Sequence, residues 1–262
     1  MNRQLGGRSI VVTGAARGIG RAIAEGIAAA GALVTVADID LAAASAVAEK
    51  IRGAGGSATA VHVDVSERAT VRAMIDAAIT GFGALHGIVN NAGIAQTTPF
   101  LDITDADWQR IMRVNSLGVM ICMQEAARRF IAQGHGGKIV NMASVGGKQA
   151  YEPLALYCAS KFSVIAFTQA GARAFGKHRI NVNAICPGVV ATDMWRVIGK
   201  GYKEAGLGDT EETAFQEFSA GLLLGRASVP EDLVGISLFL LSEHADYMTG
   251  QSVIVDGGMV LD

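Results

Sequence analysis

Short apolar runs rich in β-branched residues alternate regularly with longer alanine-rich stretches, and this alternation limits the possible folds more than any other feature of the chain. The apolar runs are continuous, which is typical of strands that helices cover on both faces. Strands that alternate with helices through right-handed crossovers form a parallel sheet. We therefore predict an α/β fold with a doubly wound parallel sheet. The predicted strands are residues 9–13, 33–37, 58–63, 87–90, 138–143, 180–185 and 252–255.

Helical patterns lie between these runs and complete the predicted organisation. Ser66 is predicted to cap the third helix, and Thr104 with Asp107 forms a capping-box pattern at the start of the fourth. Residues 193–222 are polar and interrupted by glycine, so we predict a mobile lid there. No linker or repeat breaks the rhythm, which predicts a single domain over residues 1–262. The predicted helices are residues 18–30, 41–54, 66–82, 104–132, 154–175 and 230–241.

Composition and charge exclude several classes of partner. Of the 262 residues, 50% are apolar, and the 22 Lys and Arg are balanced by 24 Asp and Glu. A net charge of −2 gives no concentrated positive field, so we expect neither a nucleic acid nor a membrane as partner. Cys122, Cys158 and Cys186 are odd in number and far apart, which favours a reducing compartment. With no signal-peptide pattern and no apolar run of ~18 residues, we expect a cytoplasmic protein.

A glycine-rich turn follows the first predicted strand and opens the first helix. Gly14 permits a tight turn, Gly18 lets backbone N–H groups approach a pyrophosphate, and Gly20 lets the helix pack closely on the strand. The positive end of the helix dipole would then face the phosphates. This turn predicts that the sheet is of the Rossmann type and binds a dinucleotide.

An acidic residue at the end of the second strand supports a dinucleotide and indicates its kind. Asp38 lies 18 residues beyond Gly20, about the offset at which a carboxylate accepts from the 2′-hydroxyl of the adenine ribose. It would repel a 2′-phosphate, so we expect NAD, although Arg17 in the turn would favour a phosphate. The alternative makes Asp38 a helix cap and Arg17 a solvated side chain.

Other loops at the same edge of the sheet add candidate cofactor residues. Asp64 and Val65 follow the third strand, where they would meet the adenine amino group and ring, although Asp64 is equally a helix-cap residue. Asn91 and Gly93 follow the fourth strand, and small or amide residues there allow close approach of a ligand to the backbone.

Tyr157 and Lys161 form the candidate catalytic pair. They lie at i and i+4, so both project from one face of a predicted helix. A neighbouring ammonium lowers the pKa of a phenol, which then exchanges a proton with an alcohol near neutral pH. Ser144 stands at the carboxyl end of the fifth strand, where open α/β sheets bind ligands, and its hydroxyl is placed to hold the same substrate oxygen.

Taken together, these motifs resemble the short-chain dehydrogenase/reductase family. The resemblance covers the whole chain, and the segments 134–139, 186–188, 193–195 and 247–252 further resemble family members that act on diols and polyols, of the acetoin reductase/meso-butanediol dehydrogenase and sorbitol dehydrogenase type. The motifs that carry it are Thr13-Gly14-x-x-x-Gly18-Ile19-Gly20, Asn90-Asn91-Ala92-Gly93, Asn115, Ser144, Tyr157-x-x-x-Lys161 and Pro187-Gly188.

The resemblance implies a function and a role for each of these positions. It implies an NAD-dependent oxidoreductase that interconverts a secondary alcohol and a ketone, assembled as a homotetramer through two long helices. Tyr157 would be the acid/base, Lys161 would lower its pKa and bind the nicotinamide ribose, Ser144 would orient the substrate, and Asn115 would hold a water that relays the proton. Ile19, Val190 and Thr192 would contact the cofactor, and Gln149 and Trp195 would contact the substrate.

Two other functions stay open at this stage. A 3-oxoacyl-carrier-protein reductase would use Arg128, Arg129 and Arg173 as a patch for an acidic carrier, although it would be expected to use NADP. A non-catalytic nucleotide-binding protein is the other alternative, because fold does not fix function. The five histidines lack metal-ligand spacing, so no metal is expected.

Overall fold

The computed structural model describes residues 4–261 and contains one seven-stranded sheet in which every neighbouring pair of strands is parallel. The strand order is β3-β2-β1-β4-β5-β6-β7, so the predicted doubly wound architecture is confirmed. Predicted and observed strand ends agree to within two residues. The strands are β1 (Ser9–Thr13), β2 (Leu33–Asp38), β3 (Ser57–His62), β4 (Gly87–Asn90), β5 (Gly137–Met142), β6 (Ile180–Pro187) and β7 (Ser252–Val255).

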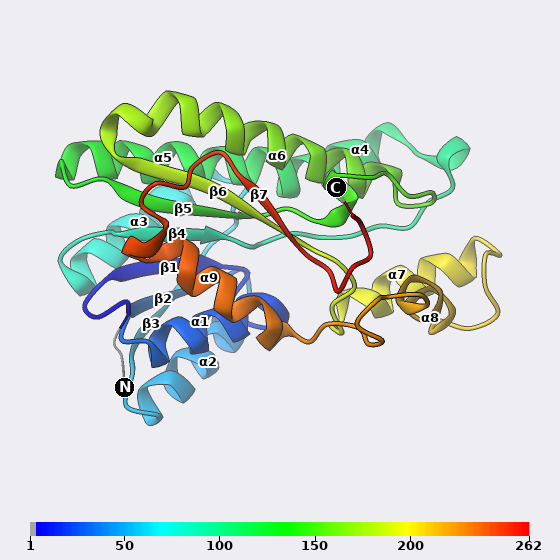
Figure 1. Cartoon of the computed structure of the whole chain (residues 1–262), viewed down its shortest axis with the longest axis horizontal. Helices are drawn as coiled ribbons and strands as arrows, with labels where there is room; N and C mark the ends of the chain where they lie inside the picture. Colours follow the sequence, from blue (N-terminus) through cyan, green and yellow to red (C-terminus); the bar gives the residue numbers. More distant parts are fainter. Residues whose placement is uncertain (1–3, 262) are drawn as a thin grey trace.

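Helices cover both faces of this sheet and bury a separate apolar core on each (Figure 1). One core lies under α1 (Gly18–Ala29), α2 (Leu41–Gly53) and α9 (Val234–Leu241). The other lies under α3 (Arg68–Phe82), α5 (Gly118–Gln133) and α6 (Ala155–Phe175). This coverage explains why the central strands are continuous apolar runs, since both of their faces are buried.

Two details of the predicted helices differ from the structure. The fourth helix is not uniform: α4 (Asp105–Met112), which begins with the predicted capping box of Thr104, continues through a π turn at Arg113–Leu117 into α5. The predicted cap Ser66 is wrong, because Glu67 occupies the N-cap of α3. The Ser66 hydroxyl instead donates to Asp64 Oδ1 at 2.7 Å, an interaction within the loop that competes with capping.

The strand order reverses between β1 and β4, and this reversal fixes where a ligand binds. β1 pairs with β2 on one side and with β4 on the other, so the chain runs outward in opposite directions from this point. The loops that follow β1 and β4 therefore separate and leave a crevice at the carboxyl ends of the strands.

The segment predicted as an irregular lid contains two helices, α7 (Met194–Glu204) and α8 (Thr213–Ser219). Figure 1 shows both beyond the carboxyl ends of the strands, set apart from the helical layers. Ile198 and Ala214 are their buried apolar residues, and a Cβ at Gly199 would collide with the Glu211 carbonyl. The two helices therefore pack closely against each other at the edge where the crevice lies.

Two glycines with left-handed backbone, Gly83 and Gly136, provide a test of the packing at the amino edge of the sheet. Gly136 (φ +80°) precedes β5, where a Cβ would collide with the Arg179 carbonyl, whereas Gly83 (φ +82°) ends α3 in open space. We expect Gly83→Ala to lower the free energy of unfolding by about 1–2 kcal/mol, from backbone strain alone. Gly136→Ala should lower it by at least about 2 kcal/mol more, from steric overlap. Equal losses in denaturant unfolding would contradict this packing.

Candidate functional site

The glycine turn after β1 has the geometry that binding of a phosphate group requires. Gly14 (φ +62°) and Gly18 (φ +54°) adopt left-handed backbone, and a Cβ at Gly20 would collide with the Gly14 carbonyl oxygen. Arg17 is the N-cap of α1, and its side chain makes no capping hydrogen bond. The first-turn N–H groups of α1 are therefore available to an anion, and the helix dipole favours negative charge there.

Asn91 braces this turn from the neighbouring strand. Its Nδ2 donates to the carbonyl oxygens of Thr13 and Gly14, both at 3.0 Å, and Thr13 Oγ1 accepts from the backbone N–H groups of Asn91 and Ala92 at 3.1 Å. The sequence predicted that Asn91 lines a cofactor. In the structure its amide holds the turn in place, so its observed contacts are with the protein.

Asp38 ends β2 next to the glycine turn. Its Oδ2 accepts from the Ala16 N–H at 2.9 Å and its Oδ1 from the Asp40 N–H at 3.1 Å. The cap of α2 is Asp40, which accepts from the Ala43 N–H at 3.0 Å. The alternative in which Asp38 caps the helix is therefore wrong, and two backbone groups orient its carboxylate beside the turn.

The other candidates for adenine contact lie in the loop after β3. Asp64 Oδ1 accepts from the backbone and hydroxyl of Ser66, and Val65 is buried against Gly118 at the start of α5. Asp64 and Val65 lie at the carboxyl edge of the sheet, as the sequence predicts. Their contacts in the structure are with other residues of the protein.

Residues after β4 and β6 complete the crevice near the middle of the sheet. A Cβ at Gly93 would lie 3.3 Å from Asn115 Oδ1 and 3.6 Å from Lys161 Nζ. A Cβ at Gly18 would lie 3.5 Å from the methyl group of Thr192. Val190 is buried, and its backbone forms a β-bridge with Ser228. Ile19 is partly buried and packs against the same apolar core to which Val190 belongs. The glycine turn and the candidate catalytic residues therefore share one crevice.

Ser144, Tyr157 and Lys161 come together at the carboxyl end of β5. The Ser144 hydroxyl accepts from the Gly146 N–H at 3.0 Å and is close enough to the Tyr157 hydroxyl to act on the pKa of that phenol. Lys161 Nζ donates to the Met142 carbonyl at 2.8 Å and lies 5.6 Å from the centre of the Tyr157 ring. Helix α6 presents Tyr157 and Lys161 on one face, as their spacing predicts.

Burial dominates the protonation of this cluster and corrects one prediction. It raises the pKa of Tyr157 to about 12, an effect that the Ser144 hydroxyl opposes, and it lowers the pKa of Lys161 to about 8. The expected lowering of the Tyr157 pKa by Lys161 is therefore not found. The physical reason is that removal from water disfavours the charged form of both groups more than their proximity favours it.

Asn115 lies in the π turn between α4 and α5, next to helix α6. It is fully buried; its Nδ2 donates to the Ile94 carbonyl at 2.9 Å and to Ser160 Oγ at 3.0 Å, and its Oδ1 accepts from the Ile94 N–H at 2.9 Å. Ser160 in turn donates to the Tyr157 carbonyl at 2.6 Å. Asn115 thus ties the loop after β4 to the helix that carries Tyr157, and π turns recur at functional sites.

Aromatic residues from the lid pack beside Tyr157. Trp195 of α7 contacts Phe218 of α8 with ring centres 5.6 Å apart, and Tyr151, in the loop before α6, packs edge-on against Phe218 at 5.6 Å. These rings share one apolar cluster with Tyr157. Gln149, predicted to contact substrate, is exposed, and its backbone N–H donates to the Val145 carbonyl.

Sequence reasoning named Trp195 but missed Tyr151 and Phe218. Tyr151 lies in the segment 149–154 that the sequence marked as variable, and Phe218 lies in the lid. The available signal was a pair of aromatic residues at i and i+3, Phe215 and Phe218, in a segment that is otherwise polar.

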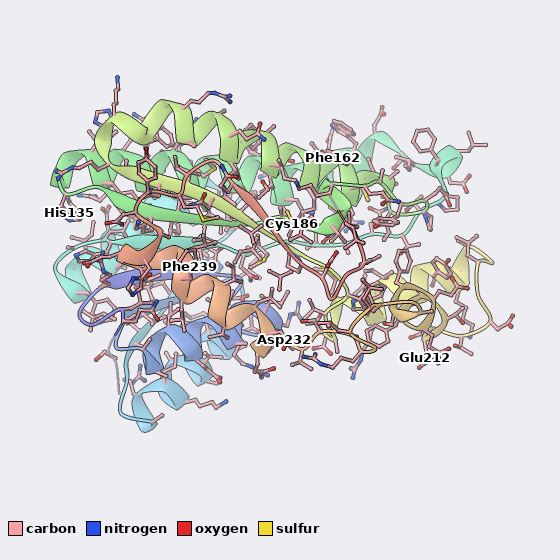
Figure 2. The ribbon with its side chains drawn as sticks, in the orientation of Figure 1. His135, Phe162, Cys186, Glu212, Asp232 and Phe239 are labelled. Atoms are coloured by element: carbon pink, nitrogen blue, oxygen red, sulfur yellow. The ribbon has the colours of Figure 1, made fainter. Side chains whose placement is uncertain are left out.

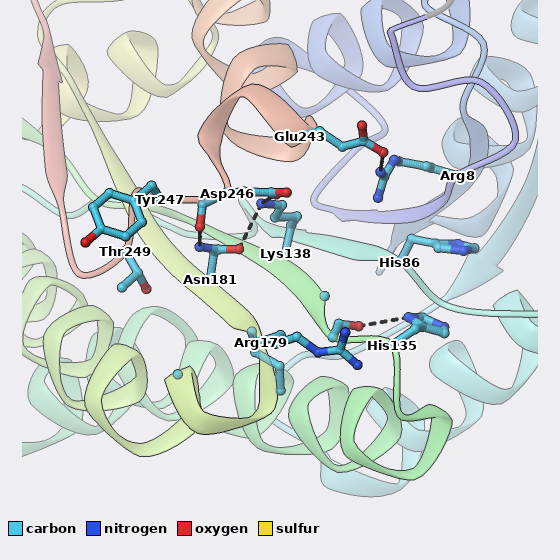
Figure 3. Close-up of a pocket in the computed structure, with 14 residues that line it drawn as sticks. Arg8, His86, His135, Lys138, Arg179, Asn181, Glu243, Asp246, Tyr247 and Thr249 are labelled. Atoms are coloured by element: carbon cyan, nitrogen blue, oxygen red, sulfur yellow. Dashed lines mark hydrogen bonds and ion pairs between the residues drawn. The ribbon is translucent and has the colours of Figure 1, made fainter.

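Another hollow lies away from the crevice, at the amino ends of the strands. It has a volume of about 670 Å³ and holds the ion pairs Arg8–Glu243 at 2.6 Å and Lys138–Asp246 at 2.5 Å (Figure 3). Figure 2 shows His135 of this hollow at the opposite end of the molecule from Glu212, which precedes α8. It is therefore separate from the crevice.

Neither a metal-binding cluster nor a membrane-spanning helix is found within residues 4–261. Over this range no group of three His, Cys, Asp or Glu side chains is arranged to hold a metal ion. Helices in the described range are also too short or too polar to cross a membrane. Cys122, Cys158 and Cys186 are free and buried.

Comparison with known proteins agrees with what the geometry of the crevice indicates. A family model described as enoyl-(acyl carrier protein) reductase matches residues 14–260. A diacetyl reductase [(S)-acetoin forming] from Staphylococcus epidermidis is 38% identical over 97% of this chain and 98% of its own length. A solved short-chain type dehydrogenase/reductase from Mycobacterium marinum covers 100% of this chain and 98% of its own, with 34% identity and a TM-score of 0.87. The chain belongs to the short-chain dehydrogenase/reductase family.

Members of the short-chain dehydrogenase/reductase family are oxidoreductases that use a nicotinamide cofactor, and the glycine turn, Asp38 and the free N-terminus of α1 fit such a group. The relatives differ in the substrates their names record. A galactitol 2-dehydrogenase from Agrobacterium fabrum is 40% identical over 97% of this chain and 98% of its own. Resemblance at this level therefore covers both small diketones and long polyols.

The depressed pKa of Lys161 predicts a measurable dependence of stability on pH. The folded chain is penalised fully below the folded pKa of about 8, and the penalty declines as pH rises toward the unfolded value of 10.5. Between pH 7 and pH 9 the wild type should gain about 1 kcal/mol of unfolding free energy relative to Lys161→Met. Denaturant unfolding of both proteins at the two pH values measures this difference, and parallel pH profiles would contradict the burial of the ammonium.

Proposed function

We propose that this protein is an NAD-dependent oxidoreductase that interconverts a secondary alcohol, a small diol or sugar alcohol, and the corresponding ketone. The observation that carries the proposal is the cluster of Ser144, Tyr157 and Lys161, which opens on the same crevice as the glycine turn. A phosphate-binding turn alone would serve many functions. A phenol, a hydroxyl and a buried amine beside it serve proton transfer to a carbonyl oxygen.

Tyr157 is the proposed acid/base of the reaction. Its raised pKa keeps the phenol protonated at neutral pH, which suits donation to a ketone oxygen. An oxygen placed beside the hydroxyls of Tyr157 and Ser144 would accept from both, which is supported by the closeness of the two hydroxyls. When bound, the nicotinamide ring supplies the hydride chemistry.

Lys161 and Asn115 have supporting roles in this proposal. The Lys161 ammonium lies beside the Tyr157 ring and would stabilise the phenolate that forms when Tyr157 gives up its proton. Its pKa of about 8 also makes it a group able to pass a proton near neutral pH. Asn115 positions the loop of Ile94 and the helix of Ser160 around this amine, and the water relay proposed for it would extend from there.

Asp38 supports NAD as the cofactor. Two backbone N–H groups hold its carboxylate beside the turn, where the 2′-hydroxyl of the adenine ribose would donate to it. A 2′-phosphate there would face a fixed negative charge. Arg17 is exposed at the start of α1 and is the group that would favour NADP.

We also propose a homotetramer built through the two long helices α5 and α6. Each of them carries an apolar side chain that is exposed in the single chain, Ile131 at 42% and Phe162 at 44%. Burial of such side chains against a second copy is favourable.

The carrier-protein alternative has less support from the structure. Of the three arginines proposed for it, Arg129 is paired with Asp76 across α5 and α3. A non-catalytic nucleotide-binding protein would have no use for the Ser144, Tyr157 and Lys161 cluster, which buries an amine at a cost in stability.

Removal of the Tyr157 hydroxyl tests the proposed acid/base. Tyr157→Phe keeps the ring in its cluster, so we expect kcat to fall by about 10²- to 10⁴-fold while NAD⁺ affinity, measured by fluorescence titration, stays within about twofold. Tyr247→Phe removes a phenol from a fully exposed position and serves as the control. Turnover by Tyr157→Phe at the wild-type rate would refute the assigned proton donor.

The charge of Asp38 is tested by a substitution of the same shape that retains one of its two acceptor oxygens. Asp38→Asn keeps an acceptor for the Ala16 N–H but removes the repulsion of a 2′-phosphate, so we expect kcat/KM for NADP⁺ relative to NAD⁺ to rise at least about tenfold. Asp40→Ala is the matched control: it removes the cap of α2 and should lower stability without changing the ratio. An unchanged ratio in Asp38→Asn would show that another group selects the cofactor.

A further inference from the structure

We propose that an aromatic wall formed by Tyr151, Trp195 and Phe218 restricts this enzyme to short secondary alcohols and α-hydroxyketones with apolar flanks, and excludes hexitols. The inference rests on the proposed function and names the substrate class within it. The proposed restriction distinguishes small diketones from hexitols. Sequence identity does not distinguish them, since relatives of similar identity carry the names diacetyl reductase and galactitol 2-dehydrogenase.

The aromatic wall joins three parts of the chain around the reactive phenol. Trp195 comes from α7 and Phe218 from α8, while Tyr151 precedes the helix that carries Tyr157. Phe218 touches both other rings, at 5.6 Å from the centre of each, and is the central member of the wall. All three rings are only partly buried, as is Tyr157 itself, so each keeps some surface for a ligand.

The rest of the lining is also apolar. Leu154, at the start of α6, belongs to the same cluster as the wall. Ile198 of α7 and Ala214 of α8 close it from the side of the lid, and Ala95 closes it from the loop after β4. A carbon chain that extends from the reacting centre into this cluster would therefore meet mostly apolar side chains.

Polar side chains at the rim of this cluster are already engaged with the protein. Gln96 Nε2 donates to Thr98 Oγ1 at 2.8 Å and Asp107 Oδ1 at 2.5 Å, and its Oε1 accepts from Arg110 at 2.6 Å. Thr97 donates to the Ile198 carbonyl at 3.0 Å. Neither side chain is available to a substrate hydroxyl without loss of these bonds.

The same holds on the side of the lid. The Tyr202 hydroxyl donates to Glu217 Oε2 at 2.7 Å, and Glu152 Oε1 accepts from the Phe100 N–H at 3.2 Å. By contrast, the Tyr151 hydroxyl forms no hydrogen bond with any residue between 4 and 261. The wall thus carries two polar groups, the Tyr151 hydroxyl and the Trp195 indole N–H, far fewer than the hydroxyls of a hexitol.

Substrate length is limited where α7 packs on the loop after β4. A Cβ at Gly201 would lie 2.8 Å from the Cβ of Thr97, so the helix and the loop are in close contact there. The hydrogen bond from Thr97 to Ile198 joins the same two elements. We infer that this contact between α7 and the loop after β4 limits how far the carbon chain of a substrate extends past the wall.

A hexitol conflicts with both features. It carries a hydroxyl on every carbon, and those beyond the one or two held by Ser144, Tyr157 and Tyr151 would be buried against hydrocarbon without partners. Each such hydroxyl lowers kcat/KM by about tenfold or more, because a buried polar group without a hydrogen bond is strongly disfavoured.

The proposal is tested by steady-state kinetics on the full-length enzyme with NAD⁺. We expect kcat/KM for 2,3-butanediol to exceed that for galactitol and for glucitol by at least about 100-fold, and acetoin to be reduced with NADH. A preference for either hexitol would overturn the aromatic-wall proposal but leave the proposed function intact. Absence of turnover with every alcohol and ketone would refute the proposed function itself.

Substitution of the central ring assigns the preference to the wall. Phe218→Asn should lower the ratio of kcat/KM for butanediol over galactitol at least tenfold, because it replaces hydrocarbon with an amide that pairs with hydroxyls. Phe218→Leu, which keeps the site apolar, should preserve the ratio and covers the case in which the Asn variant does not fold.

The matched control is Phe215→Asn on the same helix. Phe215 contacts Trp195 at 5.5 Å but does not belong to the Tyr157 cluster, so this variant loosens the lid without adding an amide to the chamber. Its substrate ratio should equal that of the wild type. Equal changes in the ratio for the Phe215 and Phe218 variants would overturn the assignment, as would an unchanged ratio in a folded Phe218→Asn.

Discussion

Parallel pairing of every strand is the constraint on which the rest of this structure depends. It brings the carboxyl ends of β1, β4, β5 and β6 to one edge, and each of these ends carries a part of the site. The hydrogen bonds from Asn91 to Thr13 and Gly14 then fix the glycine turn at the point where the strand order reverses. Without this brace, the loops after β1 and β4 would be free to move apart, and the phosphate-binding turn would lose its position relative to Tyr157.

Burial gives this edge its chemistry at a cost in stability. Tyr157 and Lys161 each lose water, which raises one pKa and lowers the other, so the neutral forms of both are favoured in the folded chain. A phenol in that state is a good donor to a ketone and requires assistance to become a base. The positive charge of an oxidised nicotinamide would act in the direction of that assistance when bound, since it would favour the phenolate.

Much of the fold was predictable because it depends on local patterns. Continuous apolar strands and the glycine turn set the topology, and the i, i+4 spacing placed Tyr157 and Lys161 on one face of α6. The failures concern quantities that only tertiary structure decides. Ser66 lost its capping role to a hydrogen bond with Asp64, and the pKa of Tyr157 moved opposite to the expectation because spacing reports proximity and not burial. Tyr151 and Phe218 meet only because the lid folds back over the loop before α6.

The two edges of the sheet differ in how completely their polar groups are satisfied, and this difference separates the proposed site from the hollow at the amino edge. At the amino edge, Lys138 is held by both Asn181 and Asp246, Arg8 by Glu243, and Arg179 donates to the Gly134 carbonyl, so these cations are engaged within the fold. At the carboxyl edge, α1 begins without a side-chain cap and the hydroxyl of Tyr151 has no partner between residues 4 and 261. A reaction requires polar groups whose hydrogen-bonding capacity is not already used within the fold. Such groups lie at the carboxyl ends of the strands. The volume of a cavity depends on how the loops around it pack. Reactivity depends instead on polar groups that are not fully hydrogen-bonded and that the fold holds in a fixed geometry.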